Sequence, residues 1–200
     1  MNPASYYTVL LASQSPRRAD LLQQHGYRFQ VKVSSAKEHM PCATTVREKV
    51  VENARVKGED ILSELNDSAL SATQPTVLCA ADTLVVLGER VYGKPANYRE
   101  AKDMLNELAE KTHKVLTGLF LKELNGTNVF EGLEETEVVL KKMNDTELEK
   151  LFAKSDPLDK AGGYGFQDAP EIVKYVKGSH TNVYGLPMEL LTNILSSWIP

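Results

Sequence analysis

The stretch Thr76–Leu87, TVLCAADTLVVL, is the most apolar strand candidate in the sequence. Its aliphatic and β-branched residues predict a buried strand, which only the polar pair Asp82-Thr83 interrupts. An unpartnered carboxylate is costly in such a strand. Asp82 is therefore expected either to hold a structural hydrogen bond or to serve a functional site. Burial suits a carboxylate to general-base chemistry, whereas a bound cation would keep it charged.

On the N-terminal side of this strand, the apolar run Tyr6–Ala12 predicts another buried strand. Ser15-Pro16 is typical of a helix start, because serine caps helices and proline fits the first turn, and Gly26 is typical of a helix end. The alternating residues of Tyr27–Val33 predict a half-buried strand. An apolar stripe predicts a helix over Thr45–Leu65.

The C-terminal side continues with alternating strands and helices. A turn is predicted at Gly88-Glu89, then a returning strand over Val91–Lys94 and a helix over Tyr98–Glu110. Two antiparallel strands follow, over Val115–Leu124 and Val129–Lys141, around an Asn125-Gly126 hairpin turn. The remaining predicted elements are a helix over Asp145–Ala153, a glycine-rich loop over Ala161–Phe166, short strands over Ile172–Val176 and Thr181–Tyr184, and a closing helix over Pro187–Trp198. Asn66–Pro75 is polar and predicts a loop. This mixture predicts an α/β or α+β fold with a mixed sheet.

The composition excludes several classes of protein. With 42% hydrophobic and 25% charged residues, the sequence is typical of a soluble globular protein. A net charge of −4 argues against a broad electrostatic grip on nucleic acid, although a local cluster of Arg and Lys can still bind one small anion. No apolar run approaches the roughly 18 residues of a membrane span. Because no basic region precedes the first apolar run, we expect a cytoplasmic protein.

Four patterns in the sequence do not indicate the sites that they resemble. The run Gly88–Lys94 (GERVYGK) has the spacing of a phosphate-binding loop, but Pro95 stands where that loop needs Ser or Thr, and the run itself predicts a turn and a strand. Neither the histidines nor the two cysteines have metal-ligand spacing. Ser13 and Ser15 lack the surroundings of a serine nucleophile.

Arg17 and Arg18 lie in the first turn of the predicted helix that begins at Pro16. The helix dipole prefers acids at that end, whereas a positive helix start with two guanidinium groups suits a phosphate chain. The alternative is a solvated pair on a surface helix. Lys94, between Gly93 and Pro95, is a further candidate cation.

Taken in order, these segments resemble the Maf family of nucleoside triphosphate pyrophosphatases. The matching pieces are Leu10–Arg18 (LLASQSPRR) with Leu21-Leu22, Asn53–Lys57 (NARVK), Ala81-Asp82-Thr83, Gly93-Lys94-Pro95 with Glu100-Ala101 and Met104-Leu105, Pro157–Gln167 (PLDKAGGYGFQ), and Gly178–Pro187 (GSHTNVYGLP). The resemblance covers nearly the whole chain. It implies one Maf-like domain over residues 1–200, with a two-lobed Maf/ITPase-like α/β architecture around an elongated mixed sheet and a central cleft.

The resemblance also implies roles for individual residues. Asp82 would be the proton acceptor that activates water. The triphosphate would be bound by Ser13, Ser15, Arg17, Arg18, Lys57 and Lys94. Glu38 would help to hold a divalent cation, Mg²⁺ first and Mn²⁺ or Co²⁺ as alternatives. Arg17, Thr83 and Gln167 match the positions that set preference for dTTP and UTP.

The function implied is hydrolysis of dTTP or UTP, with modified pyrimidine nucleotides as further substrates, to the monophosphate and pyrophosphate by a cytoplasmic homodimer. Two alternatives stay open at this stage. One is the same fold acting on a methylated guanine or another modified nucleotide. The other is a non-enzymatic nucleotide-binding regulator of cell division. Three residues depart from the usual family pattern, namely Asp20, Gly58 and Gly163.

Overall fold

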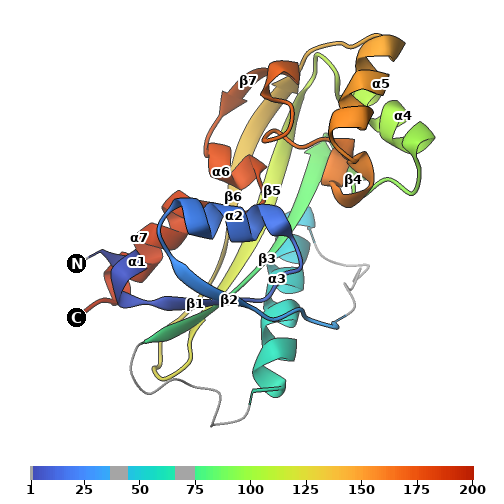
Figure 1. Ribbon diagram of the computed structural model, residues 1–200. Coiled ribbons are helices and arrows are strands. Elements are labelled where there is room, and N and C mark those ends of the chain that lie inside the picture. The colour runs from blue at the N-terminus through green and yellow to red at the C-terminus, as the bar shows by residue number, and fades with distance from the viewer. Residues whose placement is uncertain (1, 37–44, 66–74) are drawn as a thin grey trace. The chain divides into compact units, whose positions relative to one another are not determined.

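The computed structural model describes residues 2–36, 45–65 and 75–200 (Figure 1). Its helices and strands, in chain order, are α1 (Pro3–Tyr6), β1 (Thr8–Leu11), α2 (Pro16–Gln24), β2 (Arg28–Val31), α3 (Val46–Ser63), β3 (Thr76–Leu87), β4 (Arg90–Tyr92), α4 (Tyr98–Leu108), β5 (Thr112–Glu123), β6 (Val129–Leu140), α5 (Asp145–Lys154), β7 (Val173–Lys177), α6 (His180–Val183) and α7 (Met188–Trp198). Short 3₁₀ turns occur at Pro157–Asp159, Ala161–Gly163 and Pro170–Ile172.

The strands form one seven-stranded sheet in the order β2-β1-β3-β5-β6-β7, with β4 paired to β3. β1 runs parallel to both β2 and β3, whereas β4 pairs antiparallel to β3 and β7 pairs antiparallel to β6. The prediction of an α/β fold with a mixed sheet is confirmed. The β4 pairing also confirms that Gly88–Lys94 is a turn and a strand rather than a phosphate-binding loop.

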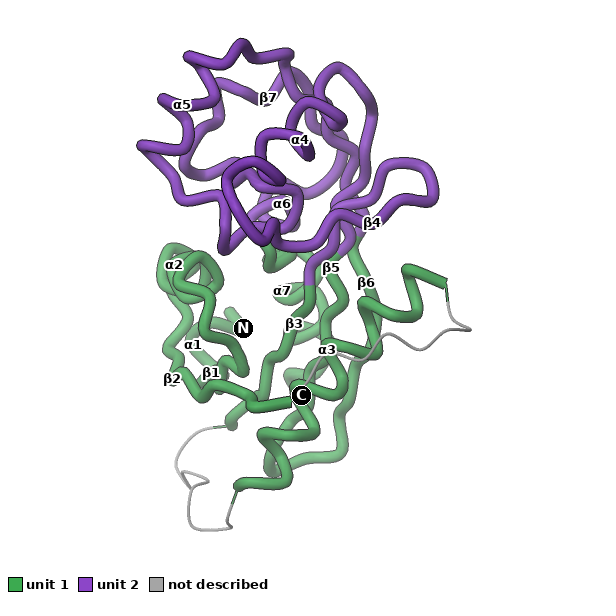
Figure 2. The backbone as a smooth tube through the Cα atoms, turned by 90° about the vertical axis from the view of Figure 1, so that its right-hand side faces the viewer, with its two compact units in different colours: residues 1–82, 117–134, 185–200 green, residues 83–116, 135–184 purple. Residues whose placement is uncertain are grey.

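The chain divides into two compact units (Figure 2). Unit 1 comprises Met1–Asp82, Thr117–Glu134 and Gly185–Pro200, and unit 2 comprises Thr83–Leu116 and Glu135–Tyr184. Three of the four boundaries fall within β3, β5 and β6, and the fourth lies between Tyr184 and Gly185, after α6. Asp82 therefore ends one unit and Thr83 begins the other.

The core of unit 1 forms where α3 packs on β3 and β5. Ile61 of α3, Leu78 of β3 and Phe120 of β5 belong to one buried cluster. Gly58 explains the closeness of the packing, because the Phe120 ring occupies the space that a Cβ would need. This contact accounts for a glycine at one of the positions where the sequence departs from the family that it resembles. At the start of α3, Thr45 and Glu48 form a capping box.

The core of unit 2 lies under α4 and α5, where Leu105, Leu108 and Leu148 are almost fully buried. Both helices begin with an asparagine whose side chain caps them, Asn97 for α4 and Asn144 for α5.

Most predicted elements are confirmed to within a few residues, but Thr181–Tyr184 is not a strand. It lies in α6, because the Ser179 hydroxyl accepts the backbone N–H of Asn182 and starts a helical turn. The Asn182 amide is buried and donates to the carbonyl of Val115 and the hydroxyl of Thr136. These tertiary bonds outweigh the preference of β-branched residues for strands. The short helix α1 was also not predicted.

Two predictions fall partly or wholly outside the described residues, namely the loop over Asn66–Pro75 and the metal ligand Glu38. Within the described ranges, no helix has the length and apolarity needed to cross a membrane.

A buried histidine lies in unit 2. His113 Nε2 is 2.7 Å from the Tyr164 hydroxyl, and the His113 side chain has no exposed surface. Burial lowers the pKa of His113 to about 4, and a hydrogen bond to the Lys111 carbonyl opposes this only in part. His113 is therefore neutral at pH 7, and with Nδ1–H donating to the Lys111 carbonyl, its Nε2 accepts a hydrogen bond from the Tyr164 hydroxyl.

We predict that His113 makes the protein less stable in acid. Because the pKa of His113 falls from 6.5 to about 4 on folding, the unfolded state binds more protons between these values. The free energy of unfolding should be highest above pH 6.5 and should fall by on the order of 3 kcal/mol as the pH drops to about 4. Urea unfolding of wild type and His113→Gln across this range measures the difference. His25→Gln, at an exposed position, is the control, and parallel pH profiles for wild type and His113→Gln would contradict the assignment.

Candidate functional site

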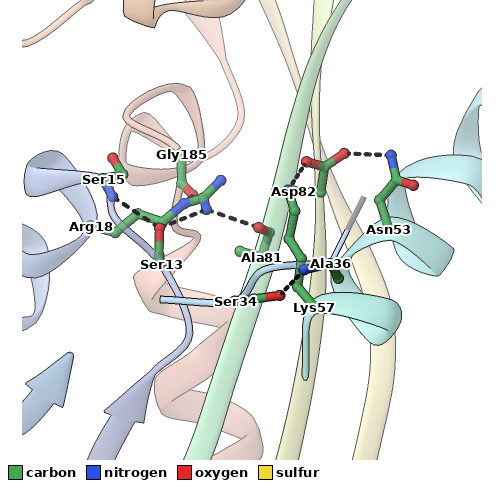
Figure 3. Close-up of polar contacts among 10 residues, drawn as sticks. All are labelled: Ser13, Ser15, Arg18, Ser34, Ala36, Asn53, Lys57, Ala81, Asp82 and Gly185. Atoms are coloured by element: carbon green, nitrogen blue, oxygen red, sulfur yellow. Dashed lines mark hydrogen bonds and ion pairs between the residues drawn. The ribbon is translucent and has the colours of Figure 1, made fainter. Parts of the chain in front are cut away.

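Asp82 lies in β3 and is only 5% exposed (Figure 3). Both of its carboxylate oxygens have a partner on α3. Lys57 Nζ is 2.6 Å from Oδ1, and Asn53 Nδ2 donates to Oδ2 at 3.1 Å. The requirement that a buried carboxylate be paired is therefore met by one ion pair and one amide hydrogen bond.

The register of α3 explains how both partners reach one carboxylate. Asn53 and Lys57 are four residues apart, so they lie on the same face of the helix. Lys49, a further turn towards the helix start, lies on this face too and is 9% exposed. α3 thus presents two lysines and an amide along one stripe of unit 1.

Asn53 was not among the predicted site residues. Its Nδ2 must face Asp82, because the flipped amide would place two oxygens against each other. Asn53 Oδ1 is then buried with no hydrogen-bond partner in the described part of the chain. The sequence could have indicated Asn53 as a site residue, because it lies one helical turn before Lys57 in NARVK and therefore on the same helix face.

The start of α2 has the features of an anion-binding helix terminus. Ser13 Oγ accepts the backbone N–H of Ser15, which shapes the turn before the helix. The Ser15 side chain forms no capping hydrogen bond, and the first turn, which carries Arg17, holds no acidic residue. In contrast, α3, α4, α5 and α7 all have an acidic residue in the first turn. The positive end of α2 is therefore not neutralised by its own first turn.

Arg18 joins three segments of unit 1 (Figure 3). Its Nη1 donates to Ser13 Oγ at 3.1 Å and to the Ala81 carbonyl at 2.8 Å, and its Nε donates to the Gly185 carbonyl at 2.8 Å. These bonds tie the start of α2 to the residue before Asp82. The structure thus gives Arg18 a positioning function, whatever charge it also contributes.

Asp60 fixes the segment that follows β2. Its Oδ2 accepts from the Ser34 hydroxyl at 2.7 Å and from the backbone N–H groups of Ser35 and Ala36. The Ser34 hydrogen bond and these N–H groups lower the pKa of Asp60. The anchored segment leads towards Glu38, which lies outside the described residues.

The remaining predicted residues belong to unit 2. Thr83 is half-buried, and Lys94 is exposed. Gln167 is half-buried, and its Oε1 is buried without a hydrogen-bond partner among the described residues. The N–H of Gly162 donates to the carbonyl of Gly93 at 3.0 Å, so the glycine-rich loop is bonded to the segment that carries Lys94.

A cysteine nucleophile receives no support from the described residues. Cys79 lies in β3, and burial raises the pKa of its thiol to about 12, although Arg18 opposes the shift. A thiol of this kind is a poor nucleophile. The described ranges also contain no group of three or more His, Cys, Asp and Glu side chains that would hold a metal by itself.

The chain belongs to the Maf family, because the family model described as Maf-like protein matches residues 8–198. This match confirms the resemblance found in the sequence.

Relatives from several bacteria are named dTTP/UTP pyrophosphatase. The relative from Halalkalibacterium halodurans is 39% identical over 181 residues, which cover 90% of each chain. That from Chlorobium phaeovibrioides is 36% identical over 90% of this chain and 91% of its own. Among solved structures, the Staphylococcus aureus Ham1 protein aligns with 96% of this chain and 100% of its own, at 16% identity and a TM-score of 0.48.

We predict that Asn53 orients the Asp82 carboxylate. In Asn53→Leu, the hydrogen bond to Oδ2 is lost while the shape of the side chain is largely kept. A hydrogen bond to a charged group contributes about 1.5–3 kcal/mol, so hydrolysis of the proposed substrate UTP should slow by at least roughly tenfold. Asn53→Gln, which keeps the amide on a longer stem, should retain more activity. Equal rates for wild type and a folded Asn53→Leu would show that Lys57 alone orients the carboxylate.

Proposed function

We propose that this protein hydrolyses dTTP and UTP to the nucleoside monophosphate and pyrophosphate. The observation that carries the proposal is the buried Asp82 of β3, held by Lys57 and Asn53 in the same unit as the start of α2, whose first turn carries arginines and no acidic residue. The proposal is further supported by relatives of this chain named dTTP/UTP pyrophosphatase.

The proposed phosphate-binding groups of unit 1 are Ser13, Ser15, Arg17, Arg18 and Lys57. The start of α2 suits a phosphate because backbone N–H groups and the helix dipole both favour an anion there. A guanidinium such as that of Arg17 binds phosphate oxygens through two parallel hydrogen bonds. Arg18 would act mainly by holding Ser13 in place, since its Nε and Nη1 already donate to protein oxygens.

Asp82 is proposed as the general base. It would accept a proton from a water molecule as the water oxygen forms a bond to the α-phosphorus. The bond between the α-phosphorus and the bridging oxygen then breaks, and pyrophosphate leaves with that oxygen. Lys57 is the natural partner for charge that develops on the phosphates, because its ammonium lies 2.6 Å from the base.

A divalent cation belongs to the proposal, with Mg²⁺ preferred and Mn²⁺ or Co²⁺ as alternatives. Mg²⁺ is usually held by one or two carboxylates together with substrate phosphates. No group of three or more acidic, histidine and cysteine side chains occurs within the described ranges, which fits a cation that would be held by Asp82 together with substrate phosphates. Glu38 is proposed as a second ligand on the basis of sequence alone. The cation would neutralise phosphate charge during cleavage.

Recognition of the substrate's nucleobase is proposed for residues of unit 2. The Gln167 amide offers a donor and an acceptor, which match the N3–H and a carbonyl of uracil or thymine. Its Oε1 is buried without a protein partner in the described residues. Such unpaired groups call for a functional explanation or an ordered water, and the nucleobase is the partner proposed for this one. Thr83 and Lys94 are proposed to contact the substrate as well, on the strength of the sequence. A cytoplasmic homodimer is the proposed setting.

The products test the proposed bond cleavage. Incubation with UTP, dTTP, CTP, ATP and GTP in Mg²⁺ should give monophosphate and pyrophosphate, fastest with UTP and dTTP. Chelation of the cation should stop the reaction, and added Mg²⁺ should restore it. Chromatography separates the products. Release of inorganic phosphate with a nucleoside diphosphate would disprove cleavage between the α- and β-phosphates. Preference for a purine triphosphate would disprove the proposed preference for uracil and thymine.

The role of Asp82 is tested by Asp82→Asn, which keeps the shape and removes the proton acceptor. The turnover number should fall by roughly 10²–10⁴-fold, with the circular dichroism spectrum unchanged. Asp103→Asn, at an exposed position on α4, is the matched control and should leave the rate as it is. Near wild-type turnover of Asp82→Asn would leave Asp82 with a structural function only.

A further inference from the structure

A buried lysine, Lys160, forms an ion pair across the loop that carries Gln167. Lys160 is 6% exposed, although lysine is rarely buried in proteins. Its Nζ donates to the Asp156 carbonyl at 2.6 Å and to Asp159 Oδ1 at 2.7 Å. It also forms an ion pair with Asp168 Oδ2 at 3.4 Å. The ion pair with Asp168 joins the residue before the glycine-rich loop, Lys160, to the residue that follows Gln167.

Asp168 is held from a second side as well. The Ser155 hydroxyl, at the end of α5, donates to Asp168 Oδ2 at 2.6 Å. The backbone N–H groups of Asp168 and Ala169 both donate to the Gly165 carbonyl at 3.2 Å. Gln167 therefore sits in a tight turn whose C-terminal end is fixed to α5 and to Lys160.

Gly165 shows how closely this turn lies against the ion pair. A Cβ built on Gly165 would be 2.7 Å from Lys160 Cε and 2.8 Å from Asp168 Oδ2. Real Cβ atoms do not approach other atoms so closely. Any side chain at this position must therefore push the loop backbone away from Lys160, or push Lys160 away from Asp168.

The residue before Gln167 is fixed too. The Phe166 ring lies 5.4 Å from the His180 ring and 5.3 Å from the Tyr184 ring, both measured between centroids. Gln167 is thus flanked by an anchored aromatic ring and an anchored carboxylate. With both neighbours held, the backbone at Gln167 has little freedom, and the direction of its amide depends on those anchors.

We propose that Lys160 is the positioning residue for base selection: through Asp168 it holds the Gln167 turn in the orientation that reads uracil or thymine. This inference rests on the proposed function, because it gives Lys160 a role only if Gln167 contacts the base. Lys160 itself does not touch the substrate. The Lys160–Asp168 ion pair is long and its Asp168 side chain is 34% exposed, so it adds little net stability, and we take placement of the turn as its function. Displacements of about 1 Å in a site can cost as much as 100-fold in rate.

The test compares selectivity rather than rate. The ratio of kcat/KM for UTP to kcat/KM for ATP does not depend on the fraction of folded enzyme, because both values scale with it. Lys160→Met removes the ammonium and keeps the aliphatic stem, and Gly165→Ala leaves both charges in place. Asp168→Asn keeps an oxygen for Ser155, whereas Asp168→Ala does not. Lys154→Met is the matched control, since Lys154 is 56% exposed in an ion pair on the same unit.

In Lys160→Met, Gly165→Ala and Asp168→Ala, the selectivity ratio should fall by roughly tenfold or more, mainly through a higher KM for UTP. Asp168→Asn should retain more selectivity than Asp168→Ala, and Lys154→Met should match the wild type. The inhibition constant of inorganic triphosphate, which has no base, should stay unchanged in every variant.

Wild-type selectivity in folded Lys160→Met would overturn the inference while leaving the proposed function intact. Should Lys160→Met not fold, wild-type selectivity in Gly165→Ala has the same meaning. If the wild type itself does not prefer UTP to ATP, the proposed function fails and the inference fails with it.

Discussion

The pairing of Asp82 by Lys57 and Asn53 is the constraint on which unit 1 depends. A carboxylate that is 5% exposed in a central strand needs partners for both oxygens, and α3 supplies them from two consecutive turns. These two bonds favour the observed register of α3 on β3. Since loss of one member of a buried ion pair costs about 3–5 kcal/mol, the group proposed as the catalytic base also contributes to the definition of the fold.

Unit 2 uses the same kind of contact for a different purpose. Lys160 and Asp168 close the glycine-rich loop, as Lys57 and Asp82 join α3 to β3. In each unit a largely buried lysine pairs with an aspartate that lies at, or next to, a proposed functional side chain. Hydrophobic packing alone holds elements together without fixing the direction of a polar group, whereas a hydrogen-bonded charge pair also fixes direction.

The start of α2 illustrates how a protein with a net charge of −4 can offer a site for a polyanion. Local geometry matters more than total charge, because screening limits each charge to its surroundings within about 10 Å. The first turn of α2 holds two arginines and no acid. Arg18 holds this turn by donating to carbonyl groups of β3 and of the segment before α7, which leaves the helix terminus pre-shaped before any ligand binds.

The sequence alone determined the features that depend on neighbouring residues. Apolar runs located β3 and the strands beside it, Ser15-Pro16 located the start of α2, and Asn125-Gly126 located the turn between β5 and β6. Asp82 was conspicuous because a polar residue interrupts an apolar strand.

Only the tertiary structure decided which groups pair with Asp82, since Asn53 and Lys57 are 29 and 25 residues away in the chain. The same holds for α6, where buried hydrogen bonds of Asn182 override the local preference for a strand. Local sequence patterns indicate secondary-structure propensity and burial. A hydrogen bond between distant segments produces no periodic pattern in the sequence, so it could not be predicted from it.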